Sequence, residues 1–325
     1  MESRVILVTG IGGNVGQGIV RNIRRRFPHM RIIGSNTERL SAGNHLCDEV
    51  HEVPYAFDPT YAEVIRHICR HEGVELIIPS TDFEAYHLSS MRDTIPTVAA
   101  SDAATGEVFL DKWLTACHFK SHGLPFAASM LPSDYTPGLL TDCIVKPRKG
   151  RGSREIFRNP ENPAAFSDEY IVQEMLVGEE LTTAFYVDRQ NSLHGHITLK
   201  RELSSGATSR CCVEDRYDTV ILPAVLGLMQ SLPIRGACNL QGIVSPDGGY
   251  RVFEINGRIS GTNSIRSNFG FEDVRYTVEE HLLGMSPTPP DIRKGVAVRI
   301  LMDVIYPDAS SYEEVFNAGA PHYIF

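Results

Sequence analysis

Short apolar runs alternate with longer amphipathic stretches through the first hundred residues. The runs predict strands near residues 4–9, 30–35, 50–53, 75–79 and 96–98, and the stretches between them predict helices near residues 15–27, 60–72 and 83–91. This alternation is typical of a parallel sheet covered by helices. The sequence therefore predicts an α/β protein whose first domain, residues 1–100, is a Rossmann-like parallel sheet.

A glycine-rich turn follows the first predicted strand, with the sequence Thr9-Gly10-Ile11-Gly12-Gly13-Asn14-Val15-Gly16. Such a turn between a strand and a helix is found in dinucleotide-binding folds. The second predicted strand, however, ends at Asn36, where NAD-binding domains usually carry Asp or Glu. No tyrosine has a lysine four residues later, as short-chain dehydrogenases require. NAD binding is therefore the disfavoured alternative.

Oxygen-bearing side chains follow one another on two later apolar segments, Asn239-Leu240-Gln241 and Glu254-Ile255-Asn256. Residues two apart share one face of a strand, so Glu254 and Asn256 should point the same way. Mg²⁺ prefers oxygen ligands and usually takes only one or two carboxylates, the rest coming from water and substrate phosphate. The pattern predicts Gln241, Glu254 and Asn256 as ligands of Mg²⁺, or of Mn²⁺, with Arg258 adding positive charge.

A basic glycine loop follows another predicted strand. Residues 143–147 read as a buried strand that contains Lys146, and residues 148–154 follow as Arg-Lys-Gly-Arg-Gly-Ser-Arg. Glycine lets backbone N–H groups approach an anion closely, and the cations offset its charge. We therefore expect this loop to cover phosphate groups. The next predicted strand begins near Tyr170 and runs into a loop that ends in carboxylates.

The stretch from about Asp111 to Arg258 resembles an ATP-grasp domain, most closely the carbamoyl-phosphate-synthase-like and carboxylate-amine-ligase branch. Four motifs carry the resemblance, in the order in which the family has them: Asp111-Lys112, residues 145–147 with their glycine loop, residues 173–176, and the segment from Gln241 to Arg258. The resemblance implies a two-subdomain ATP-grasp fold over residues 101–306. It also implies a lid over about residues 124–175 and a C-terminal tail over residues 307–325.

The resemblance further implies roles for individual residues. In the family, the phosphates would contact two cations, here Lys112 and Lys146 with its glycine loop. Adenine would bind at the hinge, residues 173–176, and the ribose hydroxyls would bind Glu180. The matching nucleotide-binding residues are Lys112, Lys146, Arg151, Gly152, Ser153, Gln173, Glu174, Met175, Leu176 and Glu180. Arg258 would contact the transferring phosphate. Many members carry an acid in place of Gln241, which leaves Glu254 as the one certain carboxylate, so we expect weak binding of free Mg²⁺.

Two groups of residues are candidates for the acceptor substrate. Asp82 and Glu84 follow a predicted strand, at the sheet edge that usually faces a ligand crevice. Asp82 is equally well placed to cap the next helix, and both interpretations stay open. Ser260, Gly261 and Arg266 lie in a polar segment after Arg258. A guanidinium group binds a carboxylate through two parallel hydrogen bonds, so Arg266 is the expected anchor of the acceptor.

Two further cations, Lys200 and Arg201, stand between the hinge and the metal ligands. We expect them to meet the substrate carboxylate or the terminal phosphate, with a solvated hairpin as the equal alternative. With Lys146 and Arg258 they complete the predicted catalytic set.

Composition narrows the class of partner. The chain has 31 basic and 40 acidic residues and a net charge of -9, which argues against nucleic acid. Seven cysteines without a Cys-x-x-Cys spacing fit a reducing cytosol. No apolar run approaches the roughly 20 residues of a membrane span. We expect a cytoplasmic protein that binds small-molecule carboxylate and amine substrates, neither nucleic acid nor membrane, and that could form a homodimer.

These parts suit phosphoryl transfer by positioning and charge neutralisation. The sequence predicts an ATP-dependent, ADP-forming carboxylate-amine ligase that forms an amide or peptide bond through an acyl phosphate, acting on an amino acid or similar small acid. A carbamoyl-phosphate-synthase-like subunit and a non-catalytic ATP-binding regulator are the alternatives.

Overall fold

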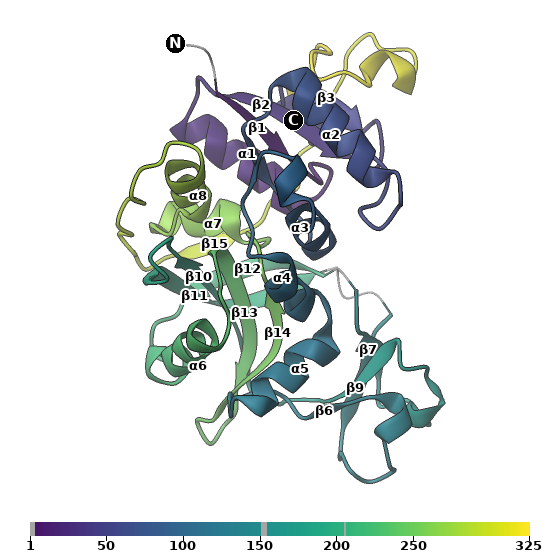
Figure 1. Ribbon diagram of the computed structural model, residues 1–325, viewed down its shortest axis with the longest axis vertical. Helices are drawn as coiled ribbons and strands as arrows, with labels where there is room; N and C mark the ends of the chain where they lie inside the picture. The colour runs from purple at the N-terminus through teal and green to yellow at the C-terminus, as the bar shows by residue number, and fades with distance from the viewer. Residues whose placement is uncertain (1–3, 151–154, 205) are drawn as a thin grey trace.

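The computed structural model describes residues 4–150, 155–204 and 206–325 and begins with a parallel sheet. Its strand order is β3-β2-β1-β4-β5 (Figure 1). The strands are β1 (Val5–Val8), β2 (Arg31–Asn36), β3 (Glu49–Glu52), β4 (Leu76–Ile78) and β5 (Thr97–Val98). The connecting helices are α1 (Asn14–Arg26), α2 (Tyr61–Glu72) and α3 (Asp82–Ser89). The predicted Rossmann-like sheet domain is confirmed.

Capping residues mark where the helices after the parallel strands begin. Thr81 is the N-cap of α3 and accepts a hydrogen bond from the backbone N–H of Glu84. The interpretation of Asp82 as a cap is therefore wrong, because Asp82 is already inside the helix. Two further helices follow: α4 (Ala103–Leu110) is capped by Asp102, and α5 (Lys112–Ser121) by Asp111.

Two antiparallel sheets form the second half of the protein. The larger has the order β14-β13-β10-β11-β12-β15 and the smaller the order β6-β9-β7-β8. The larger sheet contains β10 (Glu179–Val187), β11 (Leu193–Ser204), β12 (Ala207–Val213), β13 (Gly236–Val244), β14 (Tyr250–Asn256) and β15 (Val296–Val298). The smaller contains β6 (Ser129–Met130), β7 (Cys143–Pro147), β8 (Phe157–Arg158) and β9 (Tyr170–Glu174). Helix α6 (Asp218–Ser231) packs on the larger sheet, and the smaller sheet lies at the end of the molecule far from β1 (Figure 1).

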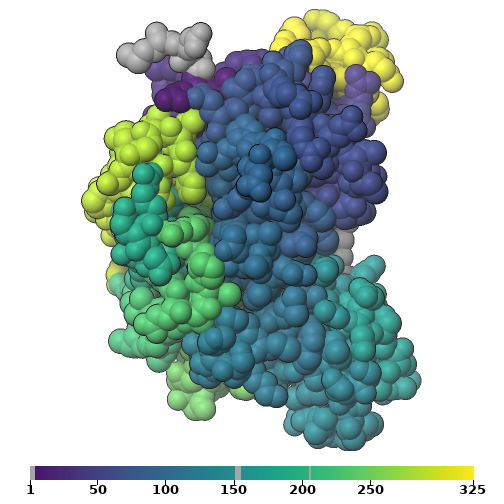
Figure 2. All heavy atoms as spheres, viewed as in Figure 1, coloured from purple at the N-terminus to yellow at the C-terminus, as the bar shows by residue number. Residues whose placement is uncertain are grey.

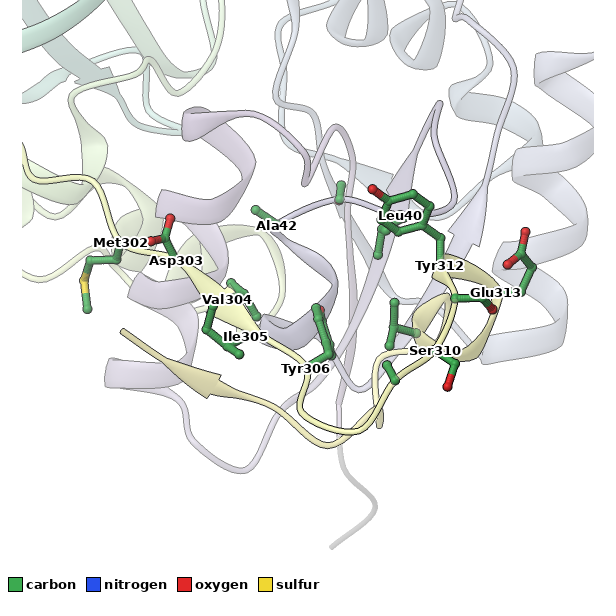
Figure 3. A pocket seen from close by; sticks show the side chains of 14 residues that line it. Leu40, Ala42, Met302, Asp303, Val304, Ile305, Tyr306, Ser310, Tyr312 and Glu313 are labelled. Carbon is green, nitrogen blue, oxygen red and sulfur yellow. The ribbon is translucent and has the colours of Figure 1, made fainter.

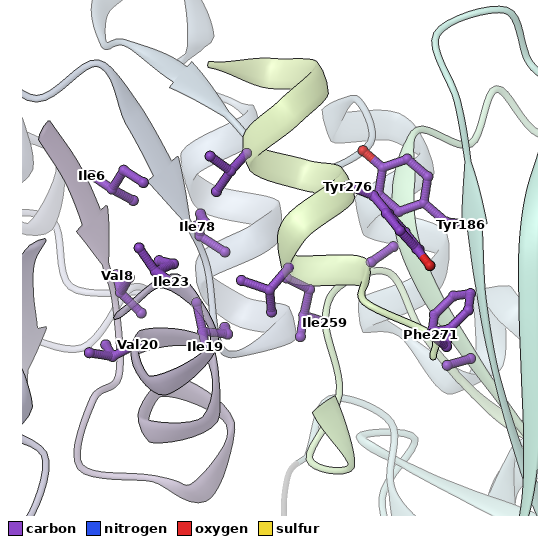
Figure 4. Packing of buried hydrophobic residues seen from close by; sticks show 14 of the residues in the cluster. Ile6, Val8, Ile19, Val20, Ile23, Ile78, Tyr186, Ile259, Phe271 and Tyr276 are labelled. Carbon is purple, nitrogen blue, oxygen red and sulfur yellow. The ribbon is translucent and has the colours of Figure 1, made fainter. Parts of the chain in front are cut away.

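One hydrophobic core joins the parallel sheet to the larger antiparallel sheet. The helices α7 (Asn263–Arg266) and α8 (Asp273–His281) belong to the region between the sheets. Figure 4 shows Tyr276 beside Tyr186 of β10, with Ile6 of β1 and Ile19 of α1 on the other side, and all four are fully or almost fully buried. Helix α1 approaches the second half so closely that a Cβ on Gly18 would lie 2.3 Å from Asn263 Oδ1. This close contact fixes the position of the N-terminal sheet edge relative to the second half of the protein.

The C-terminal segment returns to the N-terminal domain, as the yellow residues of Figures 1 and 2 show. Its strands β16 (Val304–Ile305) and β17 (Tyr323–Ile324) pair with each other. A hollow of about 840 Å³ separates this segment from residues 40–42 (Figure 3). None of the predicted site residues lines that hollow. Within the described part of the chain, no helix is both long and apolar enough to span a membrane.

Candidate functional site

A pocket of about 350 Å³ lies between the smaller and the larger antiparallel sheets. Its apolar walls include Ile144, Ile243 and Phe253. Its lining also contains most of the residues predicted to bind nucleotide or metal, namely Lys112, Lys146, Gln173, Glu174, Met175, Leu176, Glu180, Gln241 and Glu254. An apolar cleft with a few convergent polar groups is the usual form of a small-molecule site.

Two lysines in this pocket have no carboxylate partner within the described residues. Lys146 is 7% exposed, and its Nζ donates a hydrogen bond to the Phe253 carbonyl at 3.3 Å. Lys112 begins α5, and its Nζ lies 3.5 Å from the Arg148 and Gly150 carbonyl oxygens. Burial lowers the pKa of Lys146 from its ordinary 10.5 to about 8, although the negative charge of Glu254 opposes this. Burying an unpaired cation is costly, so the site favours an anionic ligand.

The predicted metal ligands meet on β13 and β14. The register pairs Gln241 with Glu254, and Gln241 Nε2 donates to Asn256 Oδ1 at 3.2 Å. Burial alone would raise the pKa of Glu254, but the charges of Lys112, Lys146 and two arginines outweigh it and lower the pKa. Glu254 is therefore ionised. One carboxylate with amide oxygens beside it fits Mg²⁺, which would take its other ligands from water and phosphate.

Asp82 of the N-terminal domain reaches this site. Its Oδ2 accepts hydrogen bonds from Arg258 Nη2 at 2.7 Å and from Asn256 Nδ2 at 3.3 Å. The Oδ1 atom of Asp82 and the Nε atom of Arg258 are buried and have no hydrogen-bond partner in the described residues. The structure thus brings together one predicted substrate residue, one predicted metal ligand and the predicted phosphate-binding arginine.

Lys200 and Arg201 lie on opposite faces of β11, because successive side chains of a strand alternate. Arg201 donates to Glu180 Oε1 at 2.9 Å and also to Gln241, so it supports two residues of the pocket. Lys200 instead pairs with Glu179 at 2.8 Å and remains half-exposed. The prediction that Lys200 is catalytic is wrong, since it faces away from the pocket.

Arg266 cannot anchor a substrate. It is 0% exposed and pairs with Asp273, and its Nη1 donates to Ser260 Oγ and Thr262 Oγ1, both at 2.7 Å. Ser260 is buried in the same network. The assignments of Arg266 and Ser260 to the acceptor wall are therefore corrected: these side chains connect α7 to α8. The sequence could not distinguish this buried ion pair from an arginine in a substrate pocket.

Glu84 is also occupied within the protein. Its carboxylate accepts a hydrogen bond from the Thr81 hydroxyl at 2.8 Å, and burial raises its pKa. It lies against the glycine turn, 3.5 Å from where a Cβ on Gly10 would be. The structure thus places Glu84 in a buried capping interaction, away from the acceptor position predicted for it. Gly10 itself has a φ of +59°, which favours glycine there.

Arg299 is a candidate anion-binding residue that was not identified from the sequence. It follows β15 and donates to the carbonyl oxygens of Thr208 at 2.9 Å and Gly261 at 3.0 Å. It pairs with no carboxylate among the residues described. Its position as the one cation in the apolar run from Val296 to Met302 was the available signal.

The predicted loop residues Arg151, Gly152 and Ser153 lie outside the described residues. Gly261 does not line the pocket, and its carbonyl oxygen accepts a hydrogen bond from Arg299.

The comparisons with known proteins agree with this geometry. Residues 6–99 match the family model "PylC-like, N-terminal domain", and residues 109–262 match that of the ATP-grasp domain. No curated protein matches the chain.

Several solved structures share the fold. N5-carboxyaminoimidazole synthetase from Staphylococcus aureus, complexed with ADP, is similar over 92% of this chain and 82% of its own, with 13% identity and a TM-score of 0.76. The L-amino acid ligase from Bacillus licheniformis is similar over 89% and 76%, with 14% identity and a TM-score of 0.69. The biotin carboxylase domain of the Hydrogenobacter thermophilus 2-oxoglutarate carboxylase is similar over 97% and 76%, with 16% identity and a TM-score of 0.68. The chain therefore belongs to the ATP-grasp superfamily and carries a PylC-like N-terminal domain before its ATP-grasp domain.

Proposed function

We propose that this protein is an ATP-dependent, ADP-forming carboxylate-amine ligase that joins an amino acid or similar small carboxylic acid to an amine. The observation that carries the proposal is the pair of lysines without carboxylate partners, Lys112 and Lys146, beside the ionised Glu254. Two cations and a carboxylate in one pocket suit a metal-bound polyphosphate, with the cations on the phosphates and the carboxylate on the metal. A regulator without catalysis would have no need of all three.

The residues would act by positioning and by charge. Magnesium, when bound through Glu254, Asn256 and Gln241, supplies charge neutralisation to the phosphate oxygens. Lys112, Lys146 and Arg258 would stabilise the charge that develops as the substrate carboxylate attacks the terminal phosphate. The products of this step are an acyl phosphate and ADP, and an amine then displaces phosphate to form the amide. No protein nucleophile is required.

We propose Arg299, in place of Arg266, as the anchor of the acid. A guanidinium without a carboxylate partner keeps donors free for a substrate carboxylate. The fold shared with an L-amino acid ligase supports an amino acid as one substrate. The fold shared with the biotin carboxylase domain, whose solved structure contains MgADP and bicarbonate, makes bicarbonate the acid to test beside it.

The test is a trapping experiment. The protein is incubated with Mg-ATP, hydroxylamine and pools of amino acids or bicarbonate, and ADP, AMP and hydroxamates are followed by mass spectrometry. ADP with a hydroxamate supports the proposal, and the mass of the hydroxamate identifies the acid. AMP in place of ADP, or bound ATP without turnover in any pool, would overturn it. Glu254→Ala serves as the inactive control.

A further inference from the structure

A carboxylate from the N-terminal domain is bound to two residues of the phosphoryl-transfer site. Asp82 belongs to the first turn of α3, and its side chain is 17% exposed. A single oxygen, Oδ2, accepts both the hydrogen bond from Arg258 Nη2 at 2.7 Å and that from Asn256 Nδ2 at 3.3 Å. Asp82 therefore restricts two side chains that belong to a different domain.

The first consequence concerns the amide of Asn256. Its nitrogen donates to Asp82 Oδ2 at 3.3 Å and to Glu254 Oε1 at 3.5 Å, and its oxygen, on the opposite side, accepts a hydrogen bond from Gln241 at 3.2 Å. Hard cations bind amide oxygen and not amide nitrogen. Asp82, the shorter of the two contacts, thus helps to hold the amide orientation that offers an oxygen on the side of Gln241. Without the Asp82 carboxylate, the nitrogen would keep only the longer contact with Glu254, and the amide would be held less firmly.

The second consequence concerns Arg258. Its side chain is 13% exposed and has a flexible aliphatic stem that ends in a planar guanidinium, which Asp82 holds through one nitrogen. The Nε atom remains without a partner in the described part of the chain, so donors are left for an anion. A held guanidinium loses less conformational entropy when it binds phosphate.

We propose that Asp82 is a positioning residue that holds Arg258 and Asn256 in the geometry needed for phosphoryl transfer. The N-terminal domain then completes a site whose other residues come from the ATP-grasp domain. The inference rests on the proposed function, because it assigns Asp82 a role in the same reaction. Groups that orient metal ligands from outside the coordination sphere typically change metal affinity or activity by about 10- to 100-fold.

The experiment compares Asp82→Asn with a matched control, Glu272→Gln. Glu272 also joins the two halves of the protein, because its carboxylate accepts a hydrogen bond from Arg26 of α1 at 2.8 Å, but it lines a different pocket. Asp82→Asn keeps the shape of the side chain and removes its charge. Mn²⁺ affinity is measured by electron paramagnetic resonance with a non-hydrolysable ATP analogue and no acid. The kcat and KM of ADP formation are measured separately, and melting temperatures confirm folding.

We expect Asp82→Asn to weaken Mn²⁺ binding and to lower kcat, each by about 10- to 100-fold, while the KM of the acid stays unchanged. Glu272→Gln should leave both quantities within about twofold. Unchanged Mn²⁺ binding and kcat in Asp82→Asn would overturn the inference, as would a rise in the acid's KM alone, which would make Asp82 a substrate contact. Equal losses in Glu272→Gln would show that the effect comes from the docking of the two domains, and they would also overturn the inference. Failure of the wild-type protein to bind Mn²⁺ with nucleotide would instead reject the proposed function.

Discussion

Lys146 should reduce the stability of the nucleotide-free protein, and Lys146→Met should increase it. A lysine pKa lowered from 10.5 to about 8 corresponds to about 3 kcal/mol of unfavourable burial of the charge at neutral pH. Methionine has a similar length and no charge. It loses the hydrogen bond to the Phe253 carbonyl, worth about 1 kcal/mol. The variant should therefore be more stable than the wild type by about 2 kcal/mol.

Urea denaturation at pH 7 without nucleotide measures this difference, with Lys120→Met as the control because Lys120 is exposed on α5. The control should change stability by less than about 0.5 kcal/mol. Mg-ATP at a hundred times its Kd should add about 2.7 kcal/mol to the wild type and much less to Lys146→Met. A less stable nucleotide-free variant, or one that ATP stabilises fully, would refute the reasoning.

The pH dependence of the same difference provides a second check. The unfolded chain keeps the Lys146 proton up to a pKa near 10.5, whereas the folded protein releases it near 8. Between these values the unfolded state binds more protons, so wild-type stability gains with rising pH relative to the variant. The advantage of Lys146→Met should thus be complete below pH 8 and shrink toward pH 10.5. An advantage that does not change over this range would contradict burial of the charge as its cause.

Three other substitutions separate catalysis, structure and substrate binding. Glu254→Ala should abolish ADP formation while the circular dichroism spectrum stays that of a folded protein; near-normal ATP consumption would disprove the metal assignment. Arg266→Ala leaves Asp273 buried and unpaired, so urea denaturation should show a loss of about 3 to 5 kcal/mol, and unchanged stability would rule out the structural role. Arg299→Ala should raise the KM of the acid by about tenfold or more without changing that of ATP, and an unchanged KM would remove this anchor.

Local patterns in the sequence were sufficient to predict the parallel sheet. Its strands are continuous apolar runs because both faces are covered, and β1 and β4 illustrate this with wholly buried residues. The placement of the predicted metal ligands on one strand face could be foreseen for a similar reason. Glu254 and Asn256 share a strand face, and this placement follows from the period of a strand alone.

Tertiary pairing decided the roles of the residues that were assigned wrongly from the sequence. Arg266 and Lys200 are polar and near the right motifs, but their roles depend on Asp273 and Glu179, whose positions arise only in the folded chain. The approach of Asp82 to Arg258 likewise joins residues 176 positions apart. The periodicity of hydrophobic and polar positions does not contain such pairings, even where, as for Arg266 and Asp273, the partners are only seven residues apart.

The return of the last residues to the N-terminal domain affects the order in which the protein can fold. Val315 and Ala320 are buried there, and the Arg39 guanidinium lies 4.8 Å from the ring centre of Phe316. During synthesis the ribosome delivers the first domain long before these residues exist. The surface around Arg39 therefore stays uncovered until residues 315–320 have been made, so this part of the N-terminal domain reaches its final packing only after the two antiparallel sheets have been synthesised.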